Sequence, residues 1–153
     1  MDVPLIEQVK IQARILIPLI KTLRSELGQE RADAIVREAL GDFYRKAGER
    51  WWHRQQGPVV GEKLAAMFDW FAGGGALEYD VVVKTANGFD ANVTRCRYAE
   101  FFQAAGEPEL GLLLVCNADF AMTEGFSDGV ELTRTQTIMQ GADHCGFHYA
   151  LKE

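Results

Sequence analysis

The residues whose types could do chemistry lie in the second half of the chain. Cys116 and Asp119 are three positions apart, so on a helix both side chains would share one face. Cys145 alternates with Phe147 and Tyr149, as residues on one face of a strand do, and should point inward with them. A thiol can act as a nucleophile, and a carboxylate can transfer protons. These residues therefore define a candidate site.

Two further residues complete this set. Cys96 stands where a predicted strand ends. Arg134 shares the parity of Val130 and Leu132 on another predicted strand, which places its side chain on the face that should be buried. A buried guanidinium is costly unless it is paired. We therefore expect Arg134 to pair with Asp119 or with the carboxylate of a substrate.

Other interpretations of the thiols stay open. A free cysteine is most often a small buried apolar residue. A metal-binding interpretation would use the three thiolates and the aspartate as tetrahedral ligands of zinc or another divalent metal, although their spacing is scattered. A Cys–His nucleophile is disfavoured, because His144 and His148 should point away from the face that carries Cys145.

Helices are predicted for the first half of the chain. Apolar residues recur at helical spacing over residues 4–27, with Gly28 as the stop, and again from residue 29 to residue 48 or beyond. A third helix should begin near Pro58, because proline suits the first helical turn. It should end at the glycine triplet 73–75.

Beyond the triplet the pattern takes the period of strands. Segment 77–96 predicts two strands joined by Asn87-Gly88, the pair that best tolerates positive φ in a two-residue turn. Two inserted helices should follow between residues 98 and 120, and two more strands over 129–139 and 145–152. The sequence thus predicts an α+β fold, with N-terminal helices packed on a mainly antiparallel sheet of about four strands.

Composition narrows the class of protein. With 153 residues, 48% of them hydrophobic, we expect a single domain over 1–153, with a helical layer at 1–72 and the sheet with its inserted helices at 77–153. The net charge of −6 argues against nucleic-acid and anionic membrane partners. The longest apolar run, at 15–20, is too short for a membrane span and lacks the features of a signal peptide. We expect a cytoplasmic protein with reduced thiols.

The stretches "EPEL", "CNADF" and "LTRTQTIMQGADHCGF" resemble the L-2-amino-thiazoline-4-carboxylic acid hydrolase family over about residues 90 to 149. The resemblance implies a small hydrolase that opens a cyclic amidine, an amide or a related non-peptide C–N bond in a carboxylate-bearing small molecule. Gly146 stands where the family pattern has an acidic residue. The residues that the resemblance marks are Cys96, Glu109, Cys116, Asp119, Arg134, Thr135, Thr137, Gly141, Cys145 and Phe147.

Roles follow from the chemistry that such a hydrolase needs. Asp119 would be the acid or base, and Arg134 would hold the substrate carboxylate. Thr135, Thr137 and Glu109 are substrate-binding candidates, and any of the three cysteines could take part in catalysis.

Two alternatives lie outside catalysis. One is a small-molecule or metal-binding module that uses the same pocket. The other is an interaction domain with an aromatic partner surface, and some of these aromatic residues would then line a homo-oligomer interface. Its residues would be Trp51, Trp52, Phe68, Trp70 and Phe71.

Overall fold

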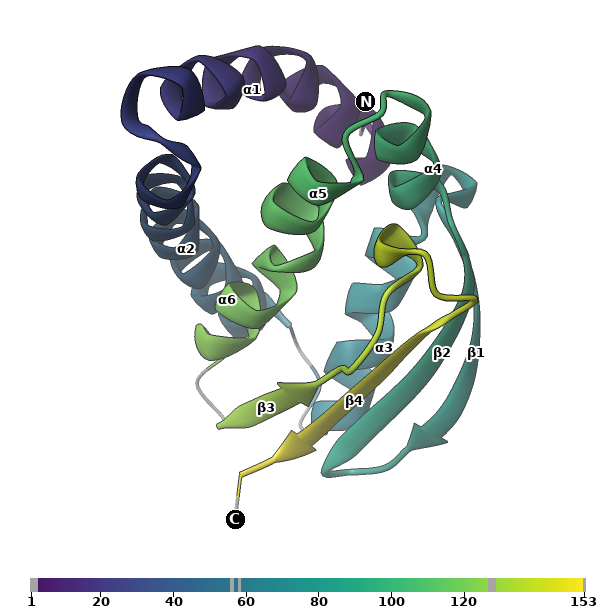
Figure 1. The fold of residues 1–153 in the computed structure, drawn as a ribbon. Coiled ribbons are helices and arrows are strands. Elements are labelled where there is room, and N and C mark those ends of the chain that lie inside the picture. The colour runs from purple at the N-terminus through teal and green to yellow at the C-terminus, as the bar shows by residue number, and fades with distance from the viewer. Residues whose placement is uncertain (1–2, 56, 58, 127–128, 153) are drawn as a thin grey trace.

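The computed structural model describes residues 3–55, 57, 59–126 and 129–152. It shows helices packed against a four-stranded antiparallel sheet, with the long helices at the N-terminal end of the chain (Figure 1). The predicted α+β class and arrangement are confirmed. The proposed helix start at Pro58 lies outside the described residues. Within the described part of the chain, no helix is long and apolar enough to cross a membrane.

The two N-terminal helices are α1 (Leu5–Leu27) and α2 (Gln29–Arg54). They meet at Gly28, whose φ of 83° favours glycine, as the predicted stop requires. Helix α2 continues past Gly48, and glycine at this position lets the helix approach α6 closely. A Cβ at Gly48 would lie 2.1 Å from the Met122 carbonyl oxygen.

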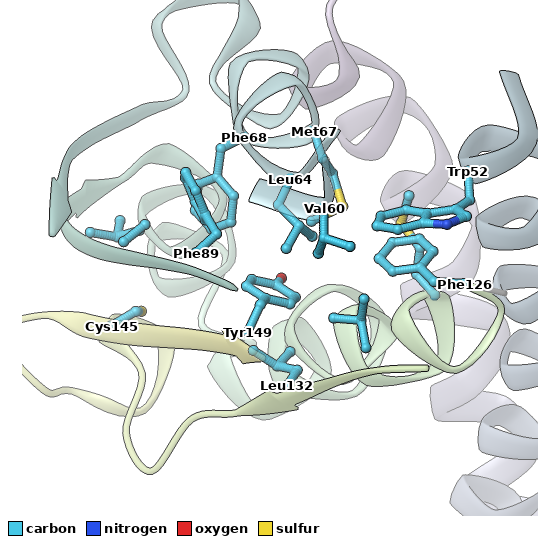
Figure 2. Packing of buried hydrophobic residues seen from close by; sticks show 14 residues of the cluster. Trp52, Val60, Leu64, Met67, Phe68, Phe89, Phe126, Leu132, Cys145 and Tyr149 are labelled. Carbon is cyan, nitrogen blue, oxygen red and sulfur yellow. The ribbon is translucent and has the colours of Figure 1, made fainter. Parts of the chain in front are cut away.

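Helix α3 (Val60–Phe71) covers the inner face of the sheet. Figure 2 shows Leu64 and Phe68 pointing toward Phe89 and Tyr149 of the strands, and all four side chains are almost fully buried. The predicted glycine boundary is confirmed as a 3-10 turn over Gly73–Gly75. This packing forms the main hydrophobic core.

The strands lie in the order β1-β2-β4-β3. Their bounds are β1 (Leu77–Lys84), β2 (Gly88–Cys96), β3 (Val130–Thr133) and β4 (Cys145–Leu151). The predicted hairpin of β1 and β2 is confirmed, and β4 agrees with the predicted segment. Strand β4 pairs with β2 on one side and with β3 on the other.

The hairpin turn lies one residue earlier than predicted. The Thr85 amide donates to the Gly88 carbonyl at 3.0 Å, so Ala86 and Asn87 are the central residues and Gly88 already belongs to β2. Neither Asn87 nor Gly88 has a positive φ. Tertiary hydrogen bonds fix the turn instead: the Ala86 and Asn87 carbonyls accept from the amides of Val60 and Leu151. These tertiary hydrogen bonds thus outweigh the preference of Asn-Gly for the two central positions of the turn.

Strand β3 is shorter than predicted, because pairing with β4 stops at Thr133 opposite His148. The chain then runs irregularly to a 3-10 turn over Ile138–Gln140. Thr137 caps this turn, since its hydroxyl accepts from the Gln140 amide at 3.2 Å. The segment between β3 and this turn therefore carries Arg134 free of the sheet ladder.

Candidate functional site

The predicted inserted helices are α4 (Arg97–Ala104) and a second, interrupted helix. The second helix consists of α5 (Pro108–Gly111), a π-turn over Leu112–Cys116, and α6 (Ala118–Glu124).

In the π-turn, the backbone hydrogen bonds differ from those of a regular α-helix. The Asn117 amide donates to the Leu112 carbonyl at 2.9 Å, and the Phe120 amide donates to the Asn117 carbonyl at 3.3 Å rather than to Cys116. π-Turns inside helices are frequent at functional sites. Here the turn leaves the Cys116 carbonyl available to a side chain.

Arg134 uses that carbonyl and the Asp119 carboxylate together. Its Nη1 donates to Asp119 Oδ2 at 2.7 Å, and its Nη2 donates to the Cys116 carbonyl at 2.9 Å. The guanidinium carbon lies 4.9 Å and 5.0 Å from the ring centroids of Phe120 and Phe147. The Arg134 side chain is 3% exposed and that of Asp119 is 18% exposed. Of the two partners expected for Arg134, a substrate carboxylate and Asp119, the structure shows Asp119.

Burial sets the proton affinity of this pair. Desolvation raises the pKa of Asp119 from its ordinary value of 3.8 to about 6, although the Arg134 guanidinium acts in the opposite direction. Burial lowers the pKa of Arg134, but the Asp119 charge and hydrogen bond outweigh it, so the guanidinium stays charged. Asp119 is therefore a carboxyl group that exchanges its proton near neutral pH.

The three thiols have structural partners or apolar surroundings. Cys96 Sγ caps α4 by accepting from the Ala99 amide at 3.5 Å, and Cys145 Sγ accepts from the Ile138 amide at 3.1 Å. Cys116 is buried in a hydrophobic cluster. Cys96 packs against this cluster and also against the main core that contains Cys145. The thiols thus share one continuous buried region.

Burial also keeps these thiols protonated. It raises the pKa of Cys96 to about 11, and it raises the pKa of Cys145. The pKa of Cys116 is raised by burial first and by the Asp119 charge second. A protonated thiol is a weak nucleophile and a poor metal ligand. Among the residues described, no group of three or more His, Cys, Asp or Glu side chains is placed to hold a metal ion.

The three predicted substrate-binding residues differ in burial and in hydrogen-bond partners. Thr137 is buried, and its hydroxyl donates to Gln140 Oε1 at 3.0 Å. Thr135 is exposed. Glu109 is exposed and accepts from Arg24 Nη2 at 2.9 Å, at the corner between α1 and α2. The substrate-binding roles of these three residues stay predictions.

His148 points away from the face that carries Cys145, as predicted, whereas His144 lies just before the last strand. Cys145 is buried and His148 is exposed, and His148 Nδ1 lies 2.5 Å from an Asp90 carboxylate oxygen. His144 Nδ1 lies 2.6 Å from Asp143 Oδ1. Strand parity is thus confirmed for the last strand.

The Tyr149 hydroxyl is a polar group near the pair that sequence reasoning missed. It is almost fully buried, and the hydroxyl of neighbouring Thr123 donates instead to the Asp119 carbonyl at 2.6 Å. Within the described residues, the Tyr149 oxygen has no hydrogen bond of good geometry. Burial first and the Asp119 charge second raise the pKa of Tyr149 far above its ordinary value, so the hydroxyl is a neutral donor. Strand parity predicts that the Tyr149 side chain points inward, but only the tertiary fold brings its hydroxyl near Asp119.

Comparison with known families identifies a matching family model. A family model described as L-2-amino-thiazoline-4-carboxylic acid hydrolase matches residues 8–149. The matched range includes the helical N-terminal part as well as the acid, the arginine and the thiols described above. A comparison with curated proteins gives no match.

Proposed function

Because the chain belongs to the L-2-amino-thiazoline-4-carboxylic acid hydrolase family, we propose that it hydrolyses a cyclic amidine at its ring C–N bond, with 2-aminothiazoline-4-carboxylate as the type of substrate. The observation that supports this activity most directly is the buried Asp119, whose pKa is about 6 and whose orientation is fixed by Arg134. A carboxyl group with such a pKa can take up and return a proton at neutral pH.

In the first step, Asp119 acts as the general base. Its carboxylate takes a proton from a water molecule as the water oxygen bonds to the carbon between the ring nitrogen and the sulfur. The C=N double bond becomes a single bond, and the protonated carboxyl group passes its proton to the ring nitrogen. The product of this step is a neutral tetrahedral carbon that bears oxygen, sulfur and two nitrogens.

In the second step, the ring C–N bond breaks. The hydroxyl on the tetrahedral carbon loses its proton through Asp119 to the ring nitrogen, which leaves as an amine. The carbon becomes the carbonyl of an S-linked carbamoyl group. Both hydrogens of the water thus end on the former ring nitrogen, and the carboxylate is regenerated.

Arg134 is a positioning residue in this proposal. Its contacts with the Cys116 carbonyl and with two aromatic rings hold the guanidinium, which in turn orients the Asp119 carboxylate. The role of Arg134 as a clamp for a substrate carboxylate stays a prediction, because its Nη1 group is engaged by Asp119 in this structure. The raised pKa values of the thiols favour water over a cysteine as the attacking group.

The test is turnover of 2-aminothiazoline-4-carboxylate by purified protein, with the carbamoyl product measured by mass spectrometry. Asp119→Asn should lower the rate about 100-fold or more, since it removes the base. Cys116→Ser and Cys145→Ser should keep the rate within about tenfold, because neither thiol attacks in this mechanism. Asp80→Asn, at an exposed carboxylate on β1, is the matched control. An inactive wild-type protein, or full activity in Asp119→Asn, would contradict the proposal.

A further inference from the structure

A cavity of about 190 Å³ lies between α1, α2, α4 and the π-turn. Most of its wall is aliphatic or aromatic, and the described lining includes no charged side chain. Gln12 and Tyr44 are the polar side chains among its lining residues. Phe43, which is 58% exposed, stands where the cavity meets solvent.

The cavity lies beside the proposed hydrolytic site without including it. Neither Asp119 nor Arg134 lines it. Its wall includes Leu114, from the same π-turn that ends at Cys116. Leu114 also packs with Cys116 and Phe102 in one hydrophobic cluster, and Phe102 lines the cavity as well.

Tyr44 also connects the cavity with the proposed hydrolytic site, as Leu114 does. It lines the cavity, and it also packs against the main core. Burial first and the Asp119 charge second raise the pKa of Tyr44, so its hydroxyl is protonated at neutral pH and stands within the electrostatic range of Asp119. Tyr44 is thus a polar residue of the cavity that also interacts electrostatically with Asp119, the proposed base.

Size and polarity define what the cavity can hold. An apolar cavity of about 150 Å³ is large enough to bind benzene. Gln12 and Phe43 are exposed, so the cavity is open to solvent on one side. A charged group placed between the helices, away from that opening, would lose its hydration without gaining a partner. An uncharged group with one hydrogen-bonding atom could use the Tyr44 hydroxyl or the Gln12 amide.

We propose that this cavity binds a compact, uncharged ring that carries one hydrogen-bonding substituent. This site goes beyond the proposed hydrolysis and does not depend on it. It would place such a ring, as a ligand separate from the substrate of the proposed hydrolysis, beside the π-turn that holds Cys116.

The first test compares phenol with benzoate, which have similar size and different charge. Both are titrated into the wild-type protein at pH 7 and followed by amide chemical shifts. Phenol should give saturable shifts in α1, α2 and the π-turn, and benzoate should bind at least about tenfold more weakly, because its charge would be desolvated. Equal binding of the two, or no saturable shift with phenol, would overturn the proposal.

A matched pair of variants locates the binding. Leu40→Phe adds volume to a residue that lines the cavity, whereas Ile35→Phe adds a similar side chain at a position of α2 that is 43% exposed. Phenol affinity should fall at least about tenfold in Leu40→Phe and stay unchanged in Ile35→Phe. Unchanged affinity in a folded Leu40→Phe protein would refute the site.

Crystals of the wild-type protein soaked with 4-bromophenol provide a measurement that needs no variant. A bromine anomalous peak inside the cavity supports the proposal, and bromine at other positions alone overturns it. None of these three binding experiments requires turnover, so a protein that binds phenol but fails to hydrolyse 2-aminothiazoline-4-carboxylate would refute the proposed function and leave this site standing.

Discussion

Replacing Asp119 with asparagine should change how the free energy of unfolding depends on pH. Asparagine keeps an oxygen that can accept from Arg134 Nη1 but removes the titration of the carboxyl group. The pKa of Asp119 is about 6 in the folded protein, against an ordinary value of 3.8. Between these two values the folded protein binds more protons than the unfolded chain does. The contribution of this group to stability is therefore present at low pH and is lost as pH rises.

The size of the effect follows from the same two values. A difference of about two pKa units corresponds to about 3 kcal/mol over the whole range, of which about 2 kcal/mol falls between pH 4.5 and 7. The wild-type protein should thus lose about 2 kcal/mol relative to Asp119→Asn over that interval. Because the Asp119 side chain is only 18% exposed, solvent screening reduces this value little.

Urea denaturation of both proteins at several pH values measures the difference. Asp80→Asn, which removes an exposed carboxylate, controls for a general change in charge. A difference between wild type and Asp119→Asn that stays constant with pH would refute the reasoning. A difference that favours the wild type as pH rises would show that the attraction of Arg134 outweighs desolvation.

Four other substitutions test individual contacts by urea denaturation. Arg134→Met leaves the Asp119 carboxylate buried without its cation, so we expect a loss of about 3–5 kcal/mol at pH 7 and a smaller loss at pH 5, where the carboxyl group is mostly protonated. Tyr149→Phe removes a hydroxyl that has no well-formed hydrogen bond within the described structure, so the free energy of unfolding should change by less than about 1 kcal/mol. A larger loss would reveal a partner for that oxygen. Gly61→Ala would place a Cβ 2.1 Å from the Thr85 carbonyl oxygen and should cost at least about 2 kcal/mol, whereas Gly146→Ala meets nothing within 4 Å and should be close to neutral. Similar results for the two glycines would contradict the close approach of α3 to the hairpin turn.

Local periodicity was enough to predict several features of the site. Alternation in the last strand placed Cys145 inward and His148 outward, as the structure confirms. The cost of burying a guanidinium predicted that Arg134 would have an acidic partner, and helical spacing brought Asp119 into the same candidate set. The strand inference succeeded because alternation depends only on residues that are close in sequence. The inference about Arg134 succeeded because it depends only on the charge of that one side chain.

Features that depend on tertiary contacts could not be predicted in this way. The π-turn that exposes the Cys116 carbonyl follows a tightly packed Gly111, where a Cβ would lie 2.5 Å from Met139 Sδ. The cap that the Thr137 hydroxyl forms on the 3-10 turn is another such feature, because residue type alone does not show whether a threonine hydroxyl bonds to the backbone. The turn at Asn87 likewise depends on hydrogen bonds from distant segments.

The pH dependence of kcat/KM for 2-aminothiazoline-4-carboxylate tests most directly the claim that Asp119 is the base. The rate should rise as pH increases through about 6 and then level off, because the carboxylate is the active form. A rate that does not change between pH 5 and 7 and rises only at alkaline pH, where the buried thiols ionise, would contradict the claim and assign the attack to a cysteine.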